Sequence, residues 1–142
     1  MSFAPIHGGC QCGAVRYTLS APPDEVIHCH CSMCRKAHGA LFATFGIYPA
    51  DALEIDKGAQ SLTDYESSPG AHRMSCPHCG AQLFNRVEKW SHQAFVCLGT
   101  LDAGARPGHD PADERHIFWE SRVHWYDAGD DLPKDEGYGE TP

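Results

Sequence analysis

Residues 76–80 read Cys-Pro-His-Cys-Gly, and an earlier stretch, residues 10–13, reads Cys-Gln-Cys-Gly. Each stretch is a close pair of cysteines followed at once by glycine. A turn that wraps a metal ion needs a residue that tolerates positive φ just after the second ligand, and glycine supplies it at no steric cost. Two such turns together provide four thiolates, the ligand set of a closed tetrahedral zinc site. We therefore predict one structural zinc ion, bound by Cys10, Cys12, Cys76 and Cys79.

This predicted site ties the N-terminal segment to the middle of the chain. Because its ligands must be gathered and deprotonated, metal binding there contributes directly to the free energy of folding. The alternative is two buried cysteine pairs without metal. We disfavour it, because close thiols gain nothing from this arrangement unless a metal holds them.

A second group of cysteines, Cys29, Cys31 and Cys34, lies in one short segment. In an extended strand, residues two apart point the same way, so Cys29 and Cys31 share a direction. Cys34 follows after a gap long enough for the chain to turn back. No glycine follows it; the cations Arg35 and Lys36 come next, and nearby cations favour thiolates. A metal held by three protein ligands keeps a free position, as in catalytic zinc sites.

A fourth protein ligand would close this second site. His38 lies four residues beyond Cys34, and residues i and i+4 share a face of a helical turn. Cys97 is a further candidate, although a lone cysteine in an apolar strand is more often a core residue. His30 lies between two cysteines that face the same way, so it is expected to point away from them. From the residues alone, the open site and the closed site are about equally supported.

An open three-thiolate zinc site can bind an incoming thiol. Zinc would lower the pKa of that thiol and hold it as a thiolate, ready to attack an aldehyde carbon. Lys36, His38 and His30 are candidates to move protons in such a reaction. The predicted partners are therefore a small-molecule thiol and an aldehyde.

Composition limits the other function classes. The length of 142 residues suits one domain over residues 1–142, with an acidic tail from about residue 127. The formal net charge of the chain is −8. Such an acidic chain lacks the electrostatic footprint of a nucleic-acid binder. It contains no apolar run that could cross a membrane, and we do not expect its first residues to act as a secretory signal. We therefore expect a cytoplasmic protein. In a reducing compartment, its eight cysteines are better interpreted as metal ligands than as disulfide partners.

Short alternating or apolar runs separated by glycine and proline predict an all-β fold. Ile117, Trp119, Val123 and Trp125 are expected on one face of a last strand, after a loop over residues 102–115. The tip of the acidic tail is expected to be poorly ordered. The remaining expected elements are strands over residues 15–20, 26–31, 41–48, 62–66, 82–87 and 94–98, and one helical turn over residues 49–53.

The sequence resembles the glutathione-dependent formaldehyde-activating enzyme family, which also includes centromere protein V. The resemblance runs through nearly the whole chain in family order. Its most specific parts are Gly8-Gly9-Cys10-Gln11-Cys12-Gly13-Ala14-Val15-Arg16-Tyr17, Cys29-His30-Cys31-Ser32-Met33-Cys34-Arg35-Lys36 and Cys76-Pro77-His78-Cys79-Gly80. Weaker similarity continues over residues 98–102, 116–118 and 125–126.

The resemblance implies an Mss4-like fold, in which a structural zinc pins twisted antiparallel sheets. By motif, Cys10, Cys12, Cys76 and Cys79 would be the structural ligands. Cys29, Cys31 and Cys34 would bind a second, catalytic zinc, which favours the open site. The implied activity is carbon–sulfur lyase chemistry, the addition of glutathione to formaldehyde to give S-hydroxymethylglutathione, or the reverse.

Two further expectations concern partners. Glutathione carries two carboxylates, so a pocket for it should present cations. The candidates are Arg16, Arg35, Lys36, Arg73 and Arg86. The alternative function is a zinc-stabilised binding module without turnover, since a fold does not by itself imply an activity. Assembly into homo-oligomers is left open by the sequence.

Overall fold

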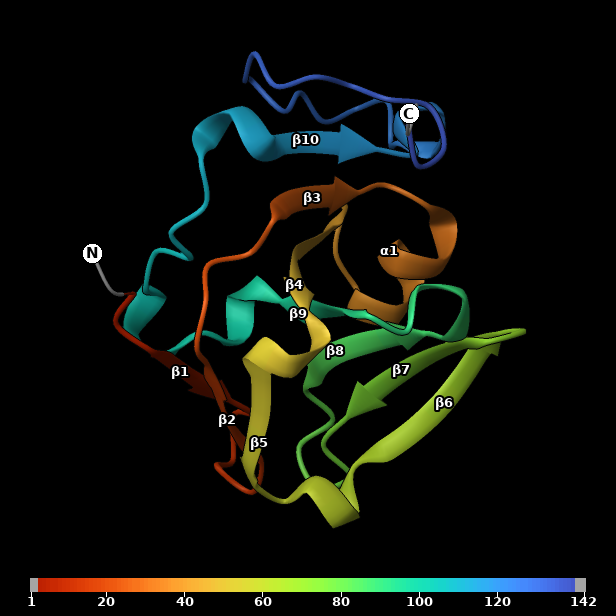
Figure 1. Ribbon diagram of the computed structural model, residues 1–142. Coiled ribbons are helices and arrows are strands. Elements are labelled where there is room, and N and C mark those ends of the chain that lie inside the picture. Colours follow the sequence, from red (N-terminus) through yellow and green to blue (C-terminus); the bar gives the residue numbers. More distant parts are fainter. Residues whose placement is uncertain (1–2, 140–142) are drawn as a thin grey trace.

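The computed structural model describes residues 3–139 and consists mainly of short strands (Figure 1). The strands are β1 (Ile6–Gly9), β2 (Arg16–Leu19), β3 (Glu25–Cys29), β4 (Ala43–Pro49), β5 (Leu53–Lys57), β6 (Thr63–Ser68), β7 (Ala71–Ser75), β8 (Gln82–Val87), β9 (Gln93–Cys97) and β10 (Glu114–Ile117). The α-helix in the described range is α1 (Ser32–His38). Single 3₁₀ turns are Ala50–Ala52, Ala59–Ser61, Glu88–Trp90, Leu98–Thr100, Asp102–Gly104, Pro111–Asp113 and Trp119–Ser121. The predicted all-β fold is confirmed.

The strands form two sheets. The smaller sheet has the order β1-β2-β5, and the larger has the order β10-β3-β4-β9-β8-β7-β6. All strand pairs are antiparallel except β10 with β3, which run parallel. This parallel pair brings Ile117 opposite Cys29, far back in the sequence. The C-terminal part of the chain is thereby fixed beside the segment with three cysteines.

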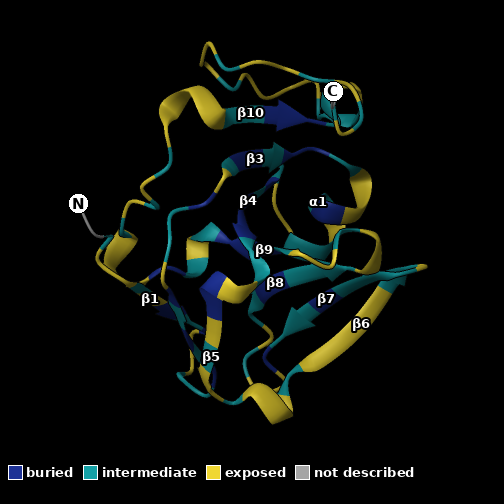
Figure 2. Cartoon of the chain, in the orientation of Figure 1, coloured by how far each residue is buried: buried dark blue, intermediate teal, exposed yellow. Residues whose placement is uncertain are grey.

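Two groups of buried side chains form the core. Tyr17 and Leu19 alternate along β2, and Val15 extends the alternation just before the strand; all three are almost completely buried, as their period-2 pattern predicts. They pack with side chains from β4, β8 and β9. A second group lies between the cysteine segment, β4 and β9, and it includes Phe45 and Phe95. Figure 2 shows this dark interior against the largely exposed edge strand β6.

The strand over residues 82–87 has the predicted bounds, and those expected near residues 15–20, 41–48, 62–66 and 94–98 shift by one or two residues. The strand expected over residues 26–31 ends at Cys29, since Cys31 already caps α1. The remaining strands, β1, β5 and β7, were not expected. No alternation of apolar and polar residues marks β1, which contains Gly8 and Gly9, or β7, which is mostly polar.

The alternating strand expected over residues 117–125 is wrong. β10 ends at Ile117 because Phe118 adopts a left-handed conformation with φ of 52°, and a 3₁₀ turn follows. His116 and Ile117 are adjacent and both buried, which an alternation between a buried and an exposed face would not give. Trp125, expected on the inner face, is 76% exposed.

Much of the acidic tail packs beside β10. The His116 amide donates to the Pro133 carbonyl at 2.9 Å, and the Asp135 amide donates to the His116 carbonyl at 3.0 Å. The Phe118 amide donates to the Gly137 carbonyl at 2.8 Å. The tip of the tail, residues 140–142, lies outside the described residues. Among the described helices, none has the length and apolar content needed to cross a bilayer.

Candidate metal centres

The two glycine-terminated turns meet in space. Cys10 directly follows β1, and Cys12 lies in the turn that leads to β2; Cys76 and Cys79 lie in the turn between β7 and β8. All four sulfurs lie within 4.8 Å of one another. This four-cysteine cluster therefore joins a hairpin of the small sheet to a hairpin of the large sheet.

The donor set of this cluster fits a tetrahedral zinc ion. Zinc–sulfur bonds of about 2.3 Å place tetrahedral sulfurs about 3.8 Å apart. The sulfurs of Cys10 and Cys12 are 3.6 Å apart, and those of Cys12 and Cys76 are 3.7 Å apart. Backbone amides also donate to the sulfurs, from Val15 to Cys10 at 3.2 Å and from His78 to Cys76 at 3.4 Å. Such donors favour thiolates, so the cluster can hold a metal.

The glycines after these cysteine pairs adopt the predicted conformation. Gly13 has a φ of 83° and Gly80 has a φ of 77°, and nothing lies within 4 Å of the position that a Cβ would take. The requirement for glycine is therefore conformational, not one of space.

The second group, Cys29, Cys31 and Cys34, forms a three-cysteine cluster whose sulfurs also lie within 4.8 Å of one another. Cys29 is the last residue of β3, and Cys34 lies in the first turn of α1. Cys31 caps that helix, because its sulfur accepts a hydrogen bond from the Cys34 amide at 3.2 Å. Cys29 and Cys34 are buried, whereas Cys31 is half-buried. Hydrogen bonds from the Cys29 and Cys34 thiols lower the pKa of Cys31 to about 2, so Cys31 carries negative charge most readily.

No fourth ligand closes this cluster within residues 3–139, since no further cysteine, histidine or carboxylate joins the three sulfurs. His38 ends α1, and its ring stands edge-on to Phe45 with centroids 5.6 Å apart. Cys97 is a buried residue of β9, and burial raises the pKa of its thiol to about 12. Both alternative ligands thus lie outside the cluster, which has the donor set of an open metal site.

His30 hydrogen-bonds away from the cluster. Its Nε2 lies 2.8 Å from Nδ1 of His116, and Nε2 of His116 lies 3.0 Å from Asp130. Burial lowers the pKa of His30 to about 4, so its ring is neutral at pH 7. The hydrogen bond from His116 lowers the pKa of Asp130 to about 2. The sequence did not predict this series of hydrogen bonds, because His30 is far from His116 and Asp130 in the sequence.

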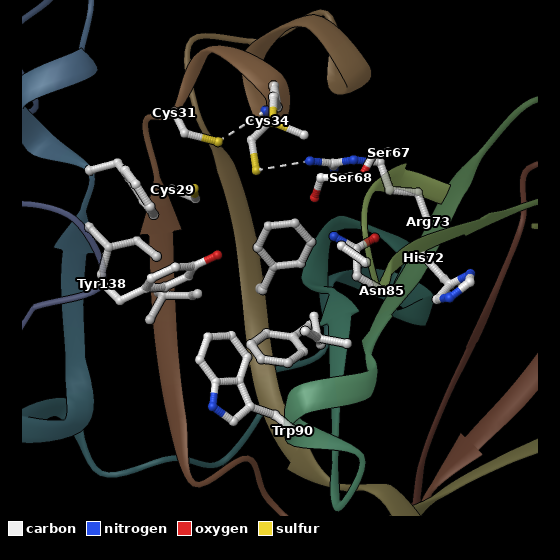
Figure 3. A pocket seen from close by; sticks show the side chains of 18 residues that line it. Cys29, Cys31, Cys34, Ser67, Ser68, His72, Arg73, Asn85, Trp90 and Tyr138 are labelled. Carbon is white, nitrogen blue, oxygen red and sulfur yellow. Dashed lines mark hydrogen bonds between the residues drawn. The ribbon is translucent and has the colours of Figure 1, made fainter. Parts of the chain in front are cut away.

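A pocket of about 180 Å³ opens beside the three-cysteine cluster (Figure 3). All three cysteines line it. Most of the other walls are apolar, and they come from strands of the large sheet, from α1 and from the segments that follow β8 and β10. These apolar walls are Ile27, Met33, Phe45, Ala71, Val87, Trp90, Phe95, Ile117 and Phe118. Tyr138 covers one side, with its ring 4.8 Å from that of Phe118 and 5.2 Å from that of Trp90.

Of the five cations considered for a glutathione pocket, the structure brings only Arg73 into contact with a cysteine sulfur. Its side chain extends from β7, and its Nη2 donates to Cys34 Sγ at 3.5 Å (Figure 3). Arg73 is only 8% exposed. The others lie elsewhere: Arg16 pairs with Asp102, Arg35 donates to the His30 carbonyl, Arg86 stacks over Phe84, and Lys36 lines a separate hollow.

A third group with metal-ligand chemistry lies at the β6–β7 edge. His72 sits between Asp64 and Glu88, with nitrogen–oxygen distances of 2.8 and 2.9 Å, and Glu66 lies near. These carboxylates raise the pKa of His72 to about 8. Both ring nitrogens are engaged, so this group is an exposed ion-pair network.

The fold and these sites define a class of protein: a small cysteine-rich β protein with one closed and one open candidate metal centre. The family model for glutathione-dependent formaldehyde-activating enzymes matches residues 5–121. The chain belongs to that family.

Known relatives agree with this assignment. A Penicillium rubens protein that carries the family's name is 34% identical over 90 residues, which is 62% of this chain and 47% of the relative. A Fusarium vanettenii protein of the same name is 32% identical over 82 residues, 56% of this chain and 44% of that protein. The chain thus spans about half the length of these curated relatives.

A solved structure supports the fold. The crystal structure of a Rhodobacter sphaeroides protein matches with a TM-score of 0.61 and 25% identity, over 72% of this chain and 92% of that one. The expected Mss4-like β architecture is therefore confirmed.

Proposed function

We propose that this protein is a zinc-dependent enzyme of the carbon–sulfur lyase type, which adds a thiol to formaldehyde or a related aldehyde, or reverses that step. The observation that carries the proposal is the three-cysteine cluster in a pocket with no fourth protein ligand among the described residues. Family membership supports the same chemistry, because the family's name couples glutathione to formaldehyde.

Under this proposal the two clusters have different roles. Cys10, Cys12, Cys76 and Cys79 hold a structural zinc, and Cys29, Cys31 and Cys34 hold a catalytic one. When bound, zinc at the open cluster would supply a Lewis-acidic position that favours the thiolate form of an incoming thiol.

The chain's own residues orient and shield the reaction. The Cys34 amide fixes the Cys31 sulfur, and Arg73 fixes the Cys34 sulfur. The aromatic walls make most of the pocket surface apolar. In the addition, a sulfur–carbon bond forms, the carbonyl π pair moves to oxygen, and the thiol proton ends on that oxygen. No electrons are gained or lost overall.

We also propose a cytoplasmic location. The eight cysteines are all free in the structure, and several free thiols gathered at two sites are best preserved in a reducing compartment.

The test is the rate of adduct formation between formaldehyde and small thiols, with the zinc-loaded protein and after subtraction of the uncatalysed rate. We expect acceleration by the wild type and a loss of at least about 100-fold in Cys31→Ser, in line with removal of a group that fixes catalytic charge. Cys97→Ala is the matched control, because Cys97 is a buried cysteine outside the cluster. If no thiol tested reacts faster with the protein than without it, the enzyme assignment is wrong and the non-catalytic binding module replaces it.

A further inference from the structure

We propose that this site acts on thiols with an uncharged, apolar body in preference to glutathione, and that Arg73 binds the oxygen of the reacting carbonyl. This inference rests on the proposed function and names its substrate class. Two observations support it. The first is the apolar chemistry of the pocket walls, and the second is the position of Arg73, the one cation in these walls that has no carboxylate partner among the described residues.

The walls offer little to a charged ligand. Only His72 and Arg73 among the lining residues can carry positive charge, and no aspartate or glutamate lines the pocket. His72 is already held between Asp64 and Glu88. Arg73 is therefore the one cation of this pocket, within the described residues, that is free of a carboxylate partner.

Arg73 stands at the reacting centre and not at the far end of the pocket. Its Nη2 is 3.5 Å from Cys34 Sγ, and its Nη1 is buried without a hydrogen-bond partner among residues 3–139. A buried donor without a partner is costly, and an incoming oxygen would satisfy it. Figure 3 shows the guanidinium reaching from β7 to Cys34, with Ser68 beside it.

This position suits an oxygen that gains charge during the reaction. When the thiolate sulfur bonds to the carbonyl carbon, the π pair moves to oxygen, and a donor fixed beforehand stabilises that negative charge. Arginine does not release a proton at ordinary pH, so the proton that ends on this oxygen comes from the thiol through solvent. The guanidinium thus serves the oxygen without taking part in the proton balance.

Glutathione fits this pocket poorly. It carries two carboxylates and an ammonium group, whereas the only suitable cation lies beside the reacting oxygen. Burying a carboxylate without a partner is strongly unfavourable. The mostly apolar walls suit a ring or a branched hydrocarbon body better than a charged tripeptide.

A second hollow gives the competing arrangement. It has a volume of about 400 Å³, shares Arg73 and Met33 with the first, and is lined also by Lys36 and Tyr65, but no cysteine lines it. Lys36 could pair with a glutathione carboxylate there. Because the three cysteines line the apolar pocket and none lines the second hollow, we favour the apolar pocket.

The first experiment compares thiols. We expect the zinc-loaded wild type to show kcat/KM for benzyl mercaptan with formaldehyde at least tenfold above that for glutathione, after subtraction of the uncatalysed rates. If glutathione is the better thiol, the substrate class is wrong; if Lys36→Gln then removes its advantage, the second hollow is the binding site.

A binding measurement separates this inference from the reaction itself. Saturation-transfer NMR with the zinc-loaded protein should show benzyl alcohol bound more tightly than S-methylglutathione, and neither compound can react. If benzyl alcohol binds more tightly but the protein shows no turnover, the apolar pocket is supported and the enzyme assignment is wrong. The reverse order would overturn the substrate class whatever the activity.

The second experiment tests Arg73. We expect Arg73→Met to lower kcat about 100-fold while zinc content and benzyl alcohol binding stay unchanged. Arg73→Lys keeps a cation near Cys34 but lacks the second nitrogen, so we expect an intermediate loss of about tenfold. Arg86→Met is the matched control, because Arg86 stacks over Phe84 and does not line the pocket. Unchanged kcat in both Arg73 variants, or a zinc loss proportional to the activity loss, would overturn the assigned role.

Discussion

The two cysteine clusters use the same ligand atoms but differ in how the chain supplies them. The four-cysteine cluster gathers its sulfurs from two turns more than 60 residues apart in sequence, and it joins two sheets. The three-cysteine cluster takes all of its sulfurs from one short segment between β3 and α1. A metal that closes a long loop constrains the fold strongly, whereas one held by a local segment constrains it little. Loss of a metal from the local cluster is therefore expected to disturb the fold less than loss from the four-cysteine cluster.

The largest expected effect is the loss of folding in Cys76→Ser. Structural zinc binding contributes roughly 10–16 kcal/mol in small zinc domains, as much as the whole stability of an ordinary domain. We expect an unfolded or insoluble protein, measured by circular dichroism and by yield in the soluble fraction. Cys31→Ser, which affects the local cluster, should remain folded. A stable, fully folded and zinc-free Cys76→Ser protein would contradict the assigned difference between the clusters.

Stepwise metal removal should separate the two clusters in the wild type. We expect a chelator to remove the ion of the open three-cysteine cluster first with the fold retained, and the ion of the four-cysteine cluster later with unfolding. Metal content and circular dichroism, followed together, measure this. Cys31→Ser should show only the second step. If the fold is lost with the first ion removed, the local cluster is structural too.

The third effect, smaller still, concerns His38. Because its ring packs on Phe45 outside the group of three sulfurs, His38→Gln should change the zinc affinity of that cluster by less than about threefold, far below the 10- to 100-fold cost of losing a functional contact to a metal site. Competition with a colorimetric zinc indicator measures this affinity. A loss of one zinc ion per protein would show that His38 closes the site after all. His124→Gln, at a histidine outside both clusters, is a suitable control.

The smallest expected effect is the titration of His72, which lies on β7 in the ion-pair network at the β6–β7 edge. Its folded-state pKa of about 8 lies above the ordinary value of 6.5, because Glu88 and Asp64 stabilise the charged ring. Its stabilising contribution is therefore complete below pH 6.5 and is lost as the pH rises through about 8. Imidazole C–H signals in NMR should report this pKa, with a slight fall in melting temperature that His72→Gln abolishes. An NMR pKa at or below 6.5 would contradict the ion-pair network.

The sequence predicted the parts of the molecule that depend on local spacing. The glycine-terminated pairs require positive φ at Gly13 and Gly80, and the short spacing within a pair keeps its two thiols close, as for Cys10 and Cys12. Likewise, the alternation of Tyr17 and Leu19 marks a half-buried strand without further context. These features have their physical cause within a few residues, so a single sequence can reveal them.

The pocket walls could not be predicted in this way. Trp90, Phe118 and Tyr138 meet only because β10 joins β3 and the tail follows it, and no local pattern encodes that pairing. The sequence offered five candidate cations, and it could not single out Arg73, because the contact of Arg73 with Cys34 joins β7 to a segment about 40 residues earlier. The mistaken strand after Ile117 has the same origin, because the backbone turn at Phe118 interrupts an alternation that its sequence still displays.

The parallel pairing of β10 with β3 also sets an order of events during synthesis. Ile117, which pairs with Cys29, leaves the ribosome about 90 residues later, which is an interval of roughly 4–20 s at ordinary elongation rates. Throughout that interval the three thiols at residues 29–34 lack the strand and tail that later wall them in. Under the proposed zinc assignment, metal capture and oxidation would compete on the nascent chain, and a zinc ion that arrived first would protect the thiols before the pocket exists.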